Sequence, residues 1–322
     1  MKPDLLLIGP VTPRMQARLD AEFTVHRLPA DPEAQGAVLA EHGSKIVAVC
    51  TGGGLGLPTP IMDQLPKLRV ISSYGVGYDT IDADLAASRG IIVAHTPNVL
   101  NDDVATTAIL LWLATSRKMV AYDSYLRAGR WEAEGYPPLT TSPQNRTVGI
   151  IGLGRIGQAI ADRLPPFGAT IVYHGRSKKD VPYRYYDNLV EMARDCEVLI
   201  CITPGGPETR HMVNAEVLKA LGPQGILVNV ARGSVVDEAA LVTALQDGTI
   251  AGAGLDVFEE EPKAPDALFS MENVTLQPHI ASATVETRQA MGDLTCDNLS
   301  QFMKDGTVIA PVPECAHLSA KG

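Results

Sequence analysis

The sequence predicts an α/β protein built from two doubly wound parallel sheets. Short apolar, β-branched runs alternate with longer helical patterns from one end of the chain to the other, which is typical of parallel strands joined by helices. The length of 322 residues exceeds what one hydrophobic core usually supports, and roughly 150 residues per domain give about two domains. We therefore expect two domains with a cleft between them.

The strand-like runs fall into two series separated by a helical pattern. The first series is at residues 4–8, 46–50, 70–73 and 91–94. The second series is at residues 147–151, 170–173, 198–202, 226–230, 254–257 and 274–276. Between them, the turn-like Thr96-Pro97-Asn98 precedes an apolar helical pattern at residues 102–118, where we place the hinge.

A last helical pattern at residues 284–304 has no strand after it. We expect this segment to return to the first unit and pack on it, which makes that domain discontinuous. The predicted domains are therefore residues 1–98 together with 288–322, and residues 99–287.

Composition and charge exclude several classes of protein. Hydrophobic residues make up 45% and charged residues 20% of the chain, which is ordinary for a globular enzyme. The formal net charge of −10 would repel nucleic acids and anionic lipids. No apolar run approaches the roughly 18 residues of a membrane span, and the apolar run at residues 5–8 is too short for a signal peptide. We expect a soluble cytoplasmic protein without a nucleic-acid or membrane partner.

The cysteines give no sign of a disulfide framework or a metal site. There are five of them, scattered along the chain and without a C-x-x-C pair: Cys50, Cys196, Cys201, Cys296 and Cys315. This pattern fits a reducing compartment. We interpret these cysteines as small buried hydrophobic residues and expect no metal.

A glycine-rich turn opens the second series of strands. The run at 147–151 leads into Gly152-Leu153-Gly154-Arg155-Ile156-Gly157 and then into a helical pattern. The glycines would permit, in order, a tight turn, close approach of a pyrophosphate and close packing of helix on strand. Amides at the helix start would then bind phosphate. A tight βα turn without a ligand is the alternative, but the flanking strand and helix favour a Rossmann-like dinucleotide site.

The segment after the next strand indicates which dinucleotide is bound. A site for NAD usually has Asp or Glu about 20 residues past the glycine turn to hold the ribose hydroxyls. Here the sequence at 174–179 is His-Gly-Arg-Ser-Lys-Lys. Arg176 could bind a 2′-phosphate as a planar fork, with Ser177 donating a hydrogen bond and Lys178 adding charge. A solvated basic turn is the alternative, but this position in an acidic chain favours NADPH over NADH.

Three side chains with catalytic chemistry follow strand-like runs of the second series, where open α/β sheets bind ligands: Arg232, Glu261 and His279. Reduction of a 2-oxo acid needs a cation to hold the carboxylate and carbonyl, and a proton donor for the carbonyl oxygen. Arg232 fits the first role. His279 fits the second, with Glu261 orienting its ring and stabilising its charge. Taken singly, each also has an ordinary interpretation as a helix cap, an acidic turn or a loop histidine.

Longer blocks carry a family resemblance over nearly the whole chain. They read SYGVGYD at 73–79, VNVARG at 228–233, AGLDVF at 253–258 and QPHI at 277–280. Together these blocks resemble the D-isomer-specific 2-hydroxyacid dehydrogenases. Within that family, Gly175-Arg176 is most similar to the NADP-dependent glyoxylate/hydroxypyruvate reductases.

The resemblance implies roles that the patterns alone do not assign. Arg232 would bind the substrate carboxylate and carbonyl, Glu261 would pair with His279, and the backbone amides of Val76 and Gly77 would hold the carboxylate in a flavodoxin-like substrate domain. Cofactor contacts would come from Thr203, Pro204, Val230, Ala231, Asp256 and His279. A helical arm at about residues 119–142 would form a homodimer, with Trp131 either reaching the partner's active site or anchoring the interface.

We therefore expect an oxidoreductase that reduces glyoxylate or hydroxypyruvate with NADPH, using His279 as general acid. A larger 2-oxo acid such as 2-ketogluconate or phenylpyruvate is an alternative substrate, because the sequence does not reveal the shape of the pocket walls around residues 51–57. A non-catalytic nucleotide-sensing protein is the other alternative. The presence of all three catalytic candidates favours an enzyme.

Overall fold

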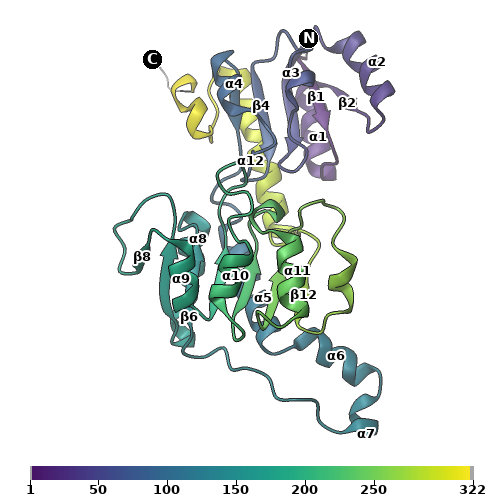
Figure 1. Ribbon diagram of the computed structural model, residues 1–322. Helices are drawn as coiled ribbons and strands as arrows, with labels where there is room; N and C mark the ends of the chain where they lie inside the picture. Colours follow the sequence, from purple (N-terminus) through teal and green to yellow (C-terminus); the bar gives the residue numbers. More distant parts are fainter. Residues whose placement is uncertain (1, 320–322) are drawn as a thin grey trace. The chain divides into compact units, whose positions relative to one another are not determined.

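The molecule consists of two compact units. The computed structural model describes residues 2–319. Unit 1 comprises Met1–Leu100 and Ala283–Gly322, and unit 2 comprises Asn101–Ser282. In Figure 1 the purple and blue part of the chain and its yellow end belong to unit 1, while the teal and green parts belong to unit 2.

Unit 1 is built on a five-stranded parallel sheet. Its strands are β1 (Asp4–Ile8), β2 (Thr24–Leu28), β3 (Ile46–Gly52), β4 (Val70–Tyr74) and β5 (Ile92–Ala94). They lie in the order β2-β1-β3-β4-β5, and every pair is parallel. This is the flavodoxin-like order of a doubly wound sheet. The apolar side chains of β1 and β3 are buried, apart from the partly buried Val47, as expected where helices cover both faces of a sheet.

The helices of unit 1 include one from the far end of the chain. They are α1 (Pro13–Glu22), α2 (Pro32–His42), α3 (Thr59–Met62), α4 (Ala83–Ser88), α12 (Val285–Asp305) and the 3₁₀ helix η4 (Pro313–Leu318). Ser72 of β4 donates from Oγ to the carbonyl oxygen of Thr295 in α12 at 2.9 Å. Arg18 of α1 forms ion pairs with Asp293 and Asp297 of α12. The returning helix α12 is therefore part of the core of unit 1.

Unit 2 is built on a seven-stranded parallel sheet. Its strands are β6 (Thr147–Ile151), β7 (Thr170–His174), β8 (Arg184–Tyr186), β9 (Val198–Cys201), β10 (Ile226–Asn229), β11 (Gly252–Leu255) and β12 (Val274–Leu276). They lie in the order β12-β11-β10-β9-β6-β7-β8. The order reverses between β6 and β9, and such a switch point is where open α/β sheets bind ligands. The predicted fold class, two doubly wound parallel sheets with a Rossmann-like second unit, is confirmed.

Helices cover the sheet of unit 2. They are α5 (Asn101–Ser116), α8 (Arg155–Ala161), α9 (Leu189–Asp195), α10 (Ala215–Leu221) and α11 (Glu238–Gln246), with the 3₁₀ helices η1 (Pro165–Phe167), η2 (Gly233–Val235) and η3 (Asp266–Ser270). Helix α5 lies close against β11, where a Cβ at Gly254 would come within 2.8 Å of the Leu111 Cβ. The glycine permits this close approach of helix and strand.

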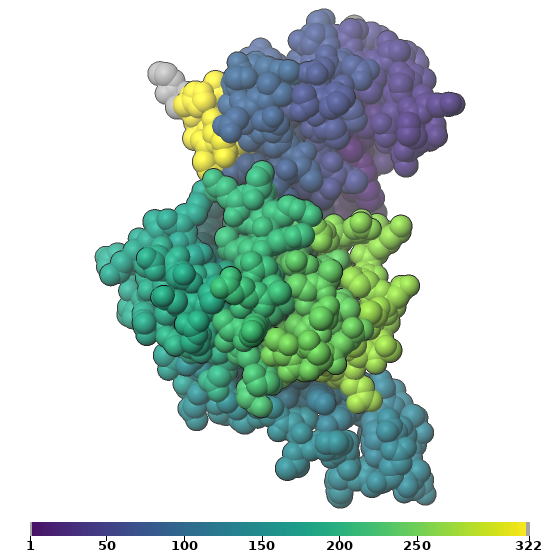
Figure 2. Space-filling view, in the orientation of Figure 1, coloured from purple at the N-terminus to yellow at the C-terminus, as the bar shows by residue number. Residues whose placement is uncertain are grey.

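Helices α6 (Met119–Arg127) and α7 (Arg130–Glu134) form an arm. Figures 1 and 2 show the arm standing out from the rest of unit 2. None of its helical residues is buried, and its exposed large apolar side chains are Met119, Val120, Leu126 and Trp131, with Tyr136 and Leu139 just beyond. A groove of about 330 Å³ lies between α6 and the segment around Phe269. Such an apolar surface is typical of an interaction site.

Other expectations from composition can be compared with the described residues. None of the helices within residues 2–319 is both long and apolar enough to cross a membrane. All five cysteines are free and buried, as their interpretation as small hydrophobic residues requires.

Candidate active site

The glycine turn lies at the carboxyl end of β6, at the switch point. Gly152 has φ +101°, a conformation that favours glycine, and a Cβ there would lie 2.9 Å from the Ile202 carbonyl oxygen. A Cβ at Gly157 would lie 2.2 Å from the Gly152 carbonyl oxygen, so this glycine permits α8 to pack on the turn. A Cβ at Gly154 would meet nothing within 4 Å. The turn thus leaves open backbone at Gly154, which fits a dinucleotide pyrophosphate.

The loop after β7 presents polar side chains to solvent. Arg176, Ser177 and Lys178 are exposed. Within residues 2–319 their side chains form no hydrogen bond or ion pair. Cationic side chains at this place fit an anionic group on the adenosine ribose of a dinucleotide.

Arg232 follows β10 in a turn held by Asn229, whose side chain is buried. Asn229 Oδ1 accepts from the Ala231 amide at 3.0 Å, and its Nδ2 donates to the Arg232 carbonyl at 2.9 Å. The next residue, Gly233, packs so closely that a Cβ would lie 1.9 Å from the Phe258 carbonyl carbon. The main chain around Arg232 is therefore fixed on both sides.

Glu261 and His279 form a hydrogen-bonded pair. The distance between His279 Nδ1 and Glu261 Oε2 is 2.7 Å, and Glu261 Oε1 accepts from the Phe258 amide at 3.1 Å. Burial opposes ionisation of Glu261, but the hydrogen bonds from His279 and Phe258 and the charges of His279 and Arg232 hold its pKa below the usual value. Glu261 is thus an ionised carboxylate that orients the imidazole ring.

Asp256 binds the loop that carries His279. Its Oδ1 accepts from the Ile280 amide at 2.7 Å and its Oδ2 from the Ala281 amide at 3.0 Å. His279 itself has φ +53°, which is uncommon for a residue with a side chain. Burial raises the pKa of Asp256, and the two amide hydrogen bonds act in the opposite direction. Both carboxylate oxygens of Asp256 therefore contact protein amides, a positioning role that the sequence did not indicate.

The remaining predicted cofactor residues lie at the same edge of the sheet. Thr203 and Pro204 follow β9, and the Pro204 carbonyl accepts hydrogen bonds from Thr203 Oγ1 at 2.9 Å and Thr209 Oγ1 at 2.8 Å. Val230 and Ala231 follow β10 and are buried. Together with the glycine turn, they line the carboxyl ends of the three central strands β6, β9 and β10.

Val76 and Gly77 lie in unit 1, just after β4. The Val76 carbonyl accepts a hydrogen bond from His95 Nδ1 at 2.9 Å. Gly77 packs against the loop after β3, where a Cβ at Gly53 would lie 2.8 Å from the Gly77 carbonyl oxygen. The amide nitrogens of Val76 and Gly77 donate no hydrogen bond to other groups of residues 2–319. These two amides are available for an anion.

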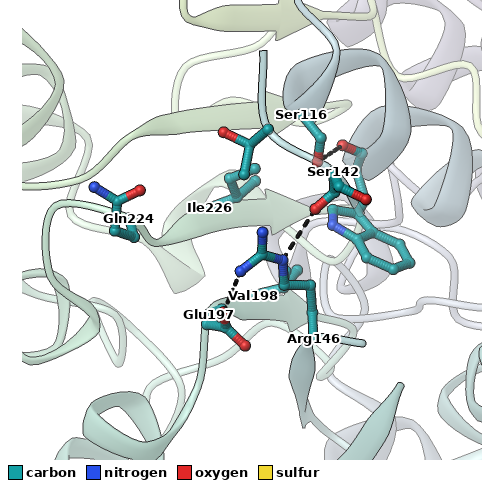
Figure 3. Close-up of a pocket in the computed structure, with 9 residues that line it drawn as sticks. Ser116, Ser142, Arg146, Glu197, Val198, Gln224 and Ile226 are labelled. Carbon is teal, nitrogen blue, oxygen red and sulfur yellow. Dashed lines mark hydrogen bonds and ion pairs between the residues drawn. The ribbon is translucent and has the colours of Figure 1, made fainter. Parts of the chain in front are cut away.

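Figure 3 shows a small hollow at the opposite edge of the unit 2 sheet, beside the start of β6, β9 and β10. Arg146 there forms an ion pair with Glu197 and donates from Nε to the Ser142 carbonyl at 3.0 Å. The volume of the hollow is about 10 Å³, the space of roughly one water molecule. A hollow of that size does not hold a dinucleotide.

Comparison with known proteins agrees with this geometry. Residues 109–281 match the family described as D-isomer specific 2-hydroxyacid dehydrogenase, NAD binding domain. The chain is 46% identical over 312 residues to the 2-ketogluconate reductase of Gluconobacter oxydans (strain 621H), covering 97% of this chain and 99% of that protein. The chain belongs to the D-isomer-specific 2-hydroxyacid dehydrogenase family. The family predicted from the sequence blocks is therefore confirmed.

Other relatives of this dehydrogenase are reductases of small acids by name. The glyoxylate/hydroxypyruvate reductase A of Arabidopsis thaliana is 41% identical, over 96% of this chain and 98% of that protein. A crystal structure of the NADPH-dependent glyoxylate/hydroxypyruvate reductase of Sinorhizobium meliloti, in complex with NADP and malonate, matches with a TM-score of 0.92. It is 48% identical and covers 98% of each chain.

In this dehydrogenase, a second group of charged residues anchors the segment that carries Glu261. Glu259 Oε1 accepts hydrogen bonds from Arg210 Nη2 at 2.5 Å and from His211 Nε2 at 3.0 Å. The Glu259 amide donates to Glu238 Oε1 at 2.8 Å. No spacing in the sequence indicates that Arg210 pairs with a glutamate 49 residues away.

Proposed function

We propose that this dehydrogenase reduces small 2-oxo acids, with glyoxylate and hydroxypyruvate as substrates and NADPH as reductant. The observation that carries the proposal is the 2.7 Å contact between His279 Nδ1 and Glu261 Oε2, in the unit that holds the glycine turn. A histidine paired with an ionised carboxylate is a suitable proton donor near neutral pH. Reduction of a carbonyl to an alcohol requires such a donor.

We assign the cofactor to the carboxyl edge of the unit 2 sheet. The residues proposed to hold it are Gly152, Leu153, Gly154, Arg155, Ile156, Gly157, Arg176, Ser177, Lys178, Thr203, Pro204, Val230, Ala231, Asp256 and His279. The open backbone at Gly154 supports the pyrophosphate position, and the exposed cations of the loop after β7 support a 2′-phosphate. NADPH bound there supplies the hydride for the carbonyl carbon.

The protein side chains orient the acid and supply the proton. Arg232 holds the carboxylate and carbonyl oxygen by charge-assisted hydrogen bonds, and the Val76 and Gly77 amides bind the carboxylate. His279 donates the proton on Nε2 to the carbonyl oxygen as negative charge develops there. One hydride and one proton convert the 2-oxo acid to a 2-hydroxy acid. Glu261 keeps the hydrogen on Nδ1 and stabilises the imidazolium before transfer.

Initial rates of NADPH and NADH oxidation by the purified protein test this proposal. Glyoxylate and hydroxypyruvate are each supplied over a range of cofactor concentrations. We expect faster turnover and a lower KM with NADPH. A preference for NADH would contradict the proposed use of NADPH and the assignment of the basic loop, but not the reduction of 2-oxo acids. The absence of oxidation with either acid would contradict the substrate proposal, and turnover with another 2-oxo acid would exclude a nucleotide-sensing protein.

A larger 2-oxo acid is the second candidate substrate. The 46% identity to a 2-ketogluconate reductase favours it, as does the 43% identity to the hydroxyphenylpyruvate reductase of Plectranthus scutellarioides. The same assay with 2-ketogluconate and hydroxyphenylpyruvate decides between the candidates. The acid with the highest kcat/KM is the preferred substrate.

We also propose that the arm at residues 119–142 forms a homodimer. The exposed apolar side chains of α6 and α7 and the groove beside Phe269 support a protein partner on this surface. Sedimentation equilibrium should give twice the chain mass of 34.3 kDa. The substitution Trp131→Ala should then weaken the dimer if this side chain anchors the interface, and should lower kcat in an intact dimer if it reaches the partner's site.

The two domains are proposed to bind different ligands. Residues 1–98 and 288–322 would bind substrate, and residues 99–287 would bind cofactor. NADPH should slow amide hydrogen exchange in the second domain, and adding oxamate should slow it at Val76 and Gly77 as well.

We further propose a cytoplasmic location, supported by five free cysteines that fit a reducing compartment. Cell fractionation tests that location.

A further inference from the structure

Tyrosine hydroxyls hold both ends of the basic loop between β7 and β8. Tyr173 is fully buried, and its hydroxyl accepts from the Lys179 amide at 2.7 Å and donates to the Lys179 carbonyl at 3.3 Å. At the other end, the Tyr185 hydroxyl donates to the Gly175 carbonyl at 3.1 Å. The main chain of the loop is thus fixed at Gly175 and at Lys179, on either side of Arg176.

The two tyrosines support each other. Tyr173 and Tyr185 are paired residues on the neighbouring strands β7 and β8, and their ring centroids are 5.3 Å apart. The end of β7 is also tied to the glycine turn, because the Gly152 amide donates to the His174 carbonyl at 2.9 Å. The backbone that presents the basic loop is therefore connected by hydrogen bonds to the backbone of the glycine turn.

The side chains of the loop contrast with its main chain. Within residues 2–319, Arg176, Ser177 and Lys178 form no side-chain contact that would hold them, whereas the backbone on both sides is bound by tyrosine hydroxyls. A fixed backbone with solvated side chains is a preorganised site, because binding an anion then requires little ordering of the chain. Without the hydroxyls, the loop would have to become ordered when the anion binds, and this loss of entropy would lower the affinity.

We propose that Tyr173 and Tyr185 are positioning residues that fix the basic loop for the 2′-phosphate of NADPH and so help determine cofactor selectivity. Neither hydroxyl binds the phosphate itself in this proposal, because each is bonded to the loop backbone. The inference rests on the proposed use of NADPH. It predicts that loss of either hydroxyl weakens binding of a 2′-phosphorylated ligand more than binding of the same ligand without that phosphate.

Calorimetric titration of the purified full-length protein with adenosine 2′,5′-bisphosphate and, separately, with 5′-AMP tests the inference. Tyr185→Phe removes one hydrogen bond to the loop backbone, and Tyr173→Phe removes two. The selectivity ratio is the Kd for 5′-AMP divided by the Kd for adenosine 2′,5′-bisphosphate. It should fall roughly three- to tenfold in Tyr185→Phe and by at least as much in Tyr173→Phe. Tyr183→Phe is the matched control, because this tyrosine lies in the same connection and forms no hydrogen bond within residues 2–319; its ratio should match that of the wild type.

Arg176→Ala separates the inference from the proposed function. If Arg176→Ala lowers the selectivity ratio and the two tyrosine variants do not, the inference is wrong while the proposed cofactor stands. If Arg176→Ala leaves the ratio unchanged, Arg176 does not bind the 2′-phosphate, and both its assignment to the cofactor site and the inference are wrong. Tyr185 is only partly buried, so Tyr185→Phe carries the test even if the fully buried Tyr173→Phe does not fold. In steady-state assays, we expect each of the two tyrosine variants to raise the KM for NADPH more than it lowers kcat.

Discussion

Asp256 holds His279 through the main chain. The Asp256 carbonyl accepts from the His279 amide at 2.7 Å, while the carboxylate binds the two amides that follow in the sequence. Asp256→Asn replaces one acceptor by an NH₂ donor, which would face the Ile280 or Ala281 amide. We expect the free energy of unfolding to fall by about 1–3 kcal/mol and kcat to fall with it. Chemical denaturation and steady-state rates measure both, and unchanged values in both would contradict the positioning role.

His279→Ala should remove the proton donor without removing the cofactor site. We expect kcat to fall by about 10²–10⁴-fold, with NADPH still bound, as followed by its fluorescence. The control is His317→Ala, since His317 is exposed in η4, which belongs to unit 1. An undiminished rate in His279→Ala would rule out this histidine as the acid.

Glu261→Gln should lower turnover. Glutamine carries no charge, so the His279 ring loses the ionised carboxylate that orients it at 2.7 Å, and we expect kcat in steady-state assays to fall while NADPH still binds. Glu260→Gln is the matched control, because the Glu260 side chain forms no hydrogen bond or ion pair within residues 2–319. A kcat that Glu261→Gln leaves unchanged would contradict the pairing.

Acid should also remove the stabilising effect of the Glu261 pair. The pKa of Glu261 is lower in the folded protein than its usual value. Its contribution to stability is therefore fully present above the usual value and is lost as pH falls through the lowered one. The difference in free energy of unfolding between wild type and Glu261→Gln should disappear as the pH falls through the lowered pKa of Glu261. Denaturation curves recorded at several acidic pH values measure this difference. A difference that persists below that pKa would mean that the effect is not electrostatic.

Gly233→Ala should displace the segment that carries Glu261. The new Cβ would lie 1.9 Å from the Phe258 carbonyl carbon, so the main chain must shift. We expect lower thermal stability and a large loss of kcat. Gly36→Ala in α2 is the contrasting variant, because its Cβ would meet nothing within 4 Å and alanine favours a helix by about 1 kcal/mol. A melting temperature that Gly233→Ala does not lower would show that the contact is easily relieved.

The sequence predicted most strands because buried parallel strands are short apolar runs. β1 and β6 begin and end where the pattern placed them. β2 and β8 were not predicted, since both are edge strands with exposed or polar positions, and β8 has three residues. β11 begins two residues before the predicted run, at Gly252. Glycine weakens a strand pattern, yet here it is required because a Cβ would strike the Asn273 carbonyl.

The candidate site was predictable only where a residue type carries the chemistry. Arg232, Glu261 and His279 stand out because charge and proton transfer need those side chains. Asn229 and Asp256 act through hydrogen bonds to main-chain amides, and any polar residue near a strand end could do so. The contact between Glu259 and Arg210 depends on which loops the strand order brings together. Such pairing is a property of the folded sheet rather than of local spacing.

The return of α12 to unit 1 has a consequence for synthesis on the ribosome. Unit 2 is a continuous stretch of chain, whereas unit 1 is interrupted by it and completed by the residues from Ala283 onward. Domains generally fold as units during translation, so unit 2 can close its core while the ribosome is still adding α12. The first hundred residues must wait, with the faces of β4 and α1 that receive α12 uncovered. The amino-terminal part of this chain is therefore the last to finish folding, and the part most in need of protection from aggregation until α12 packs on it.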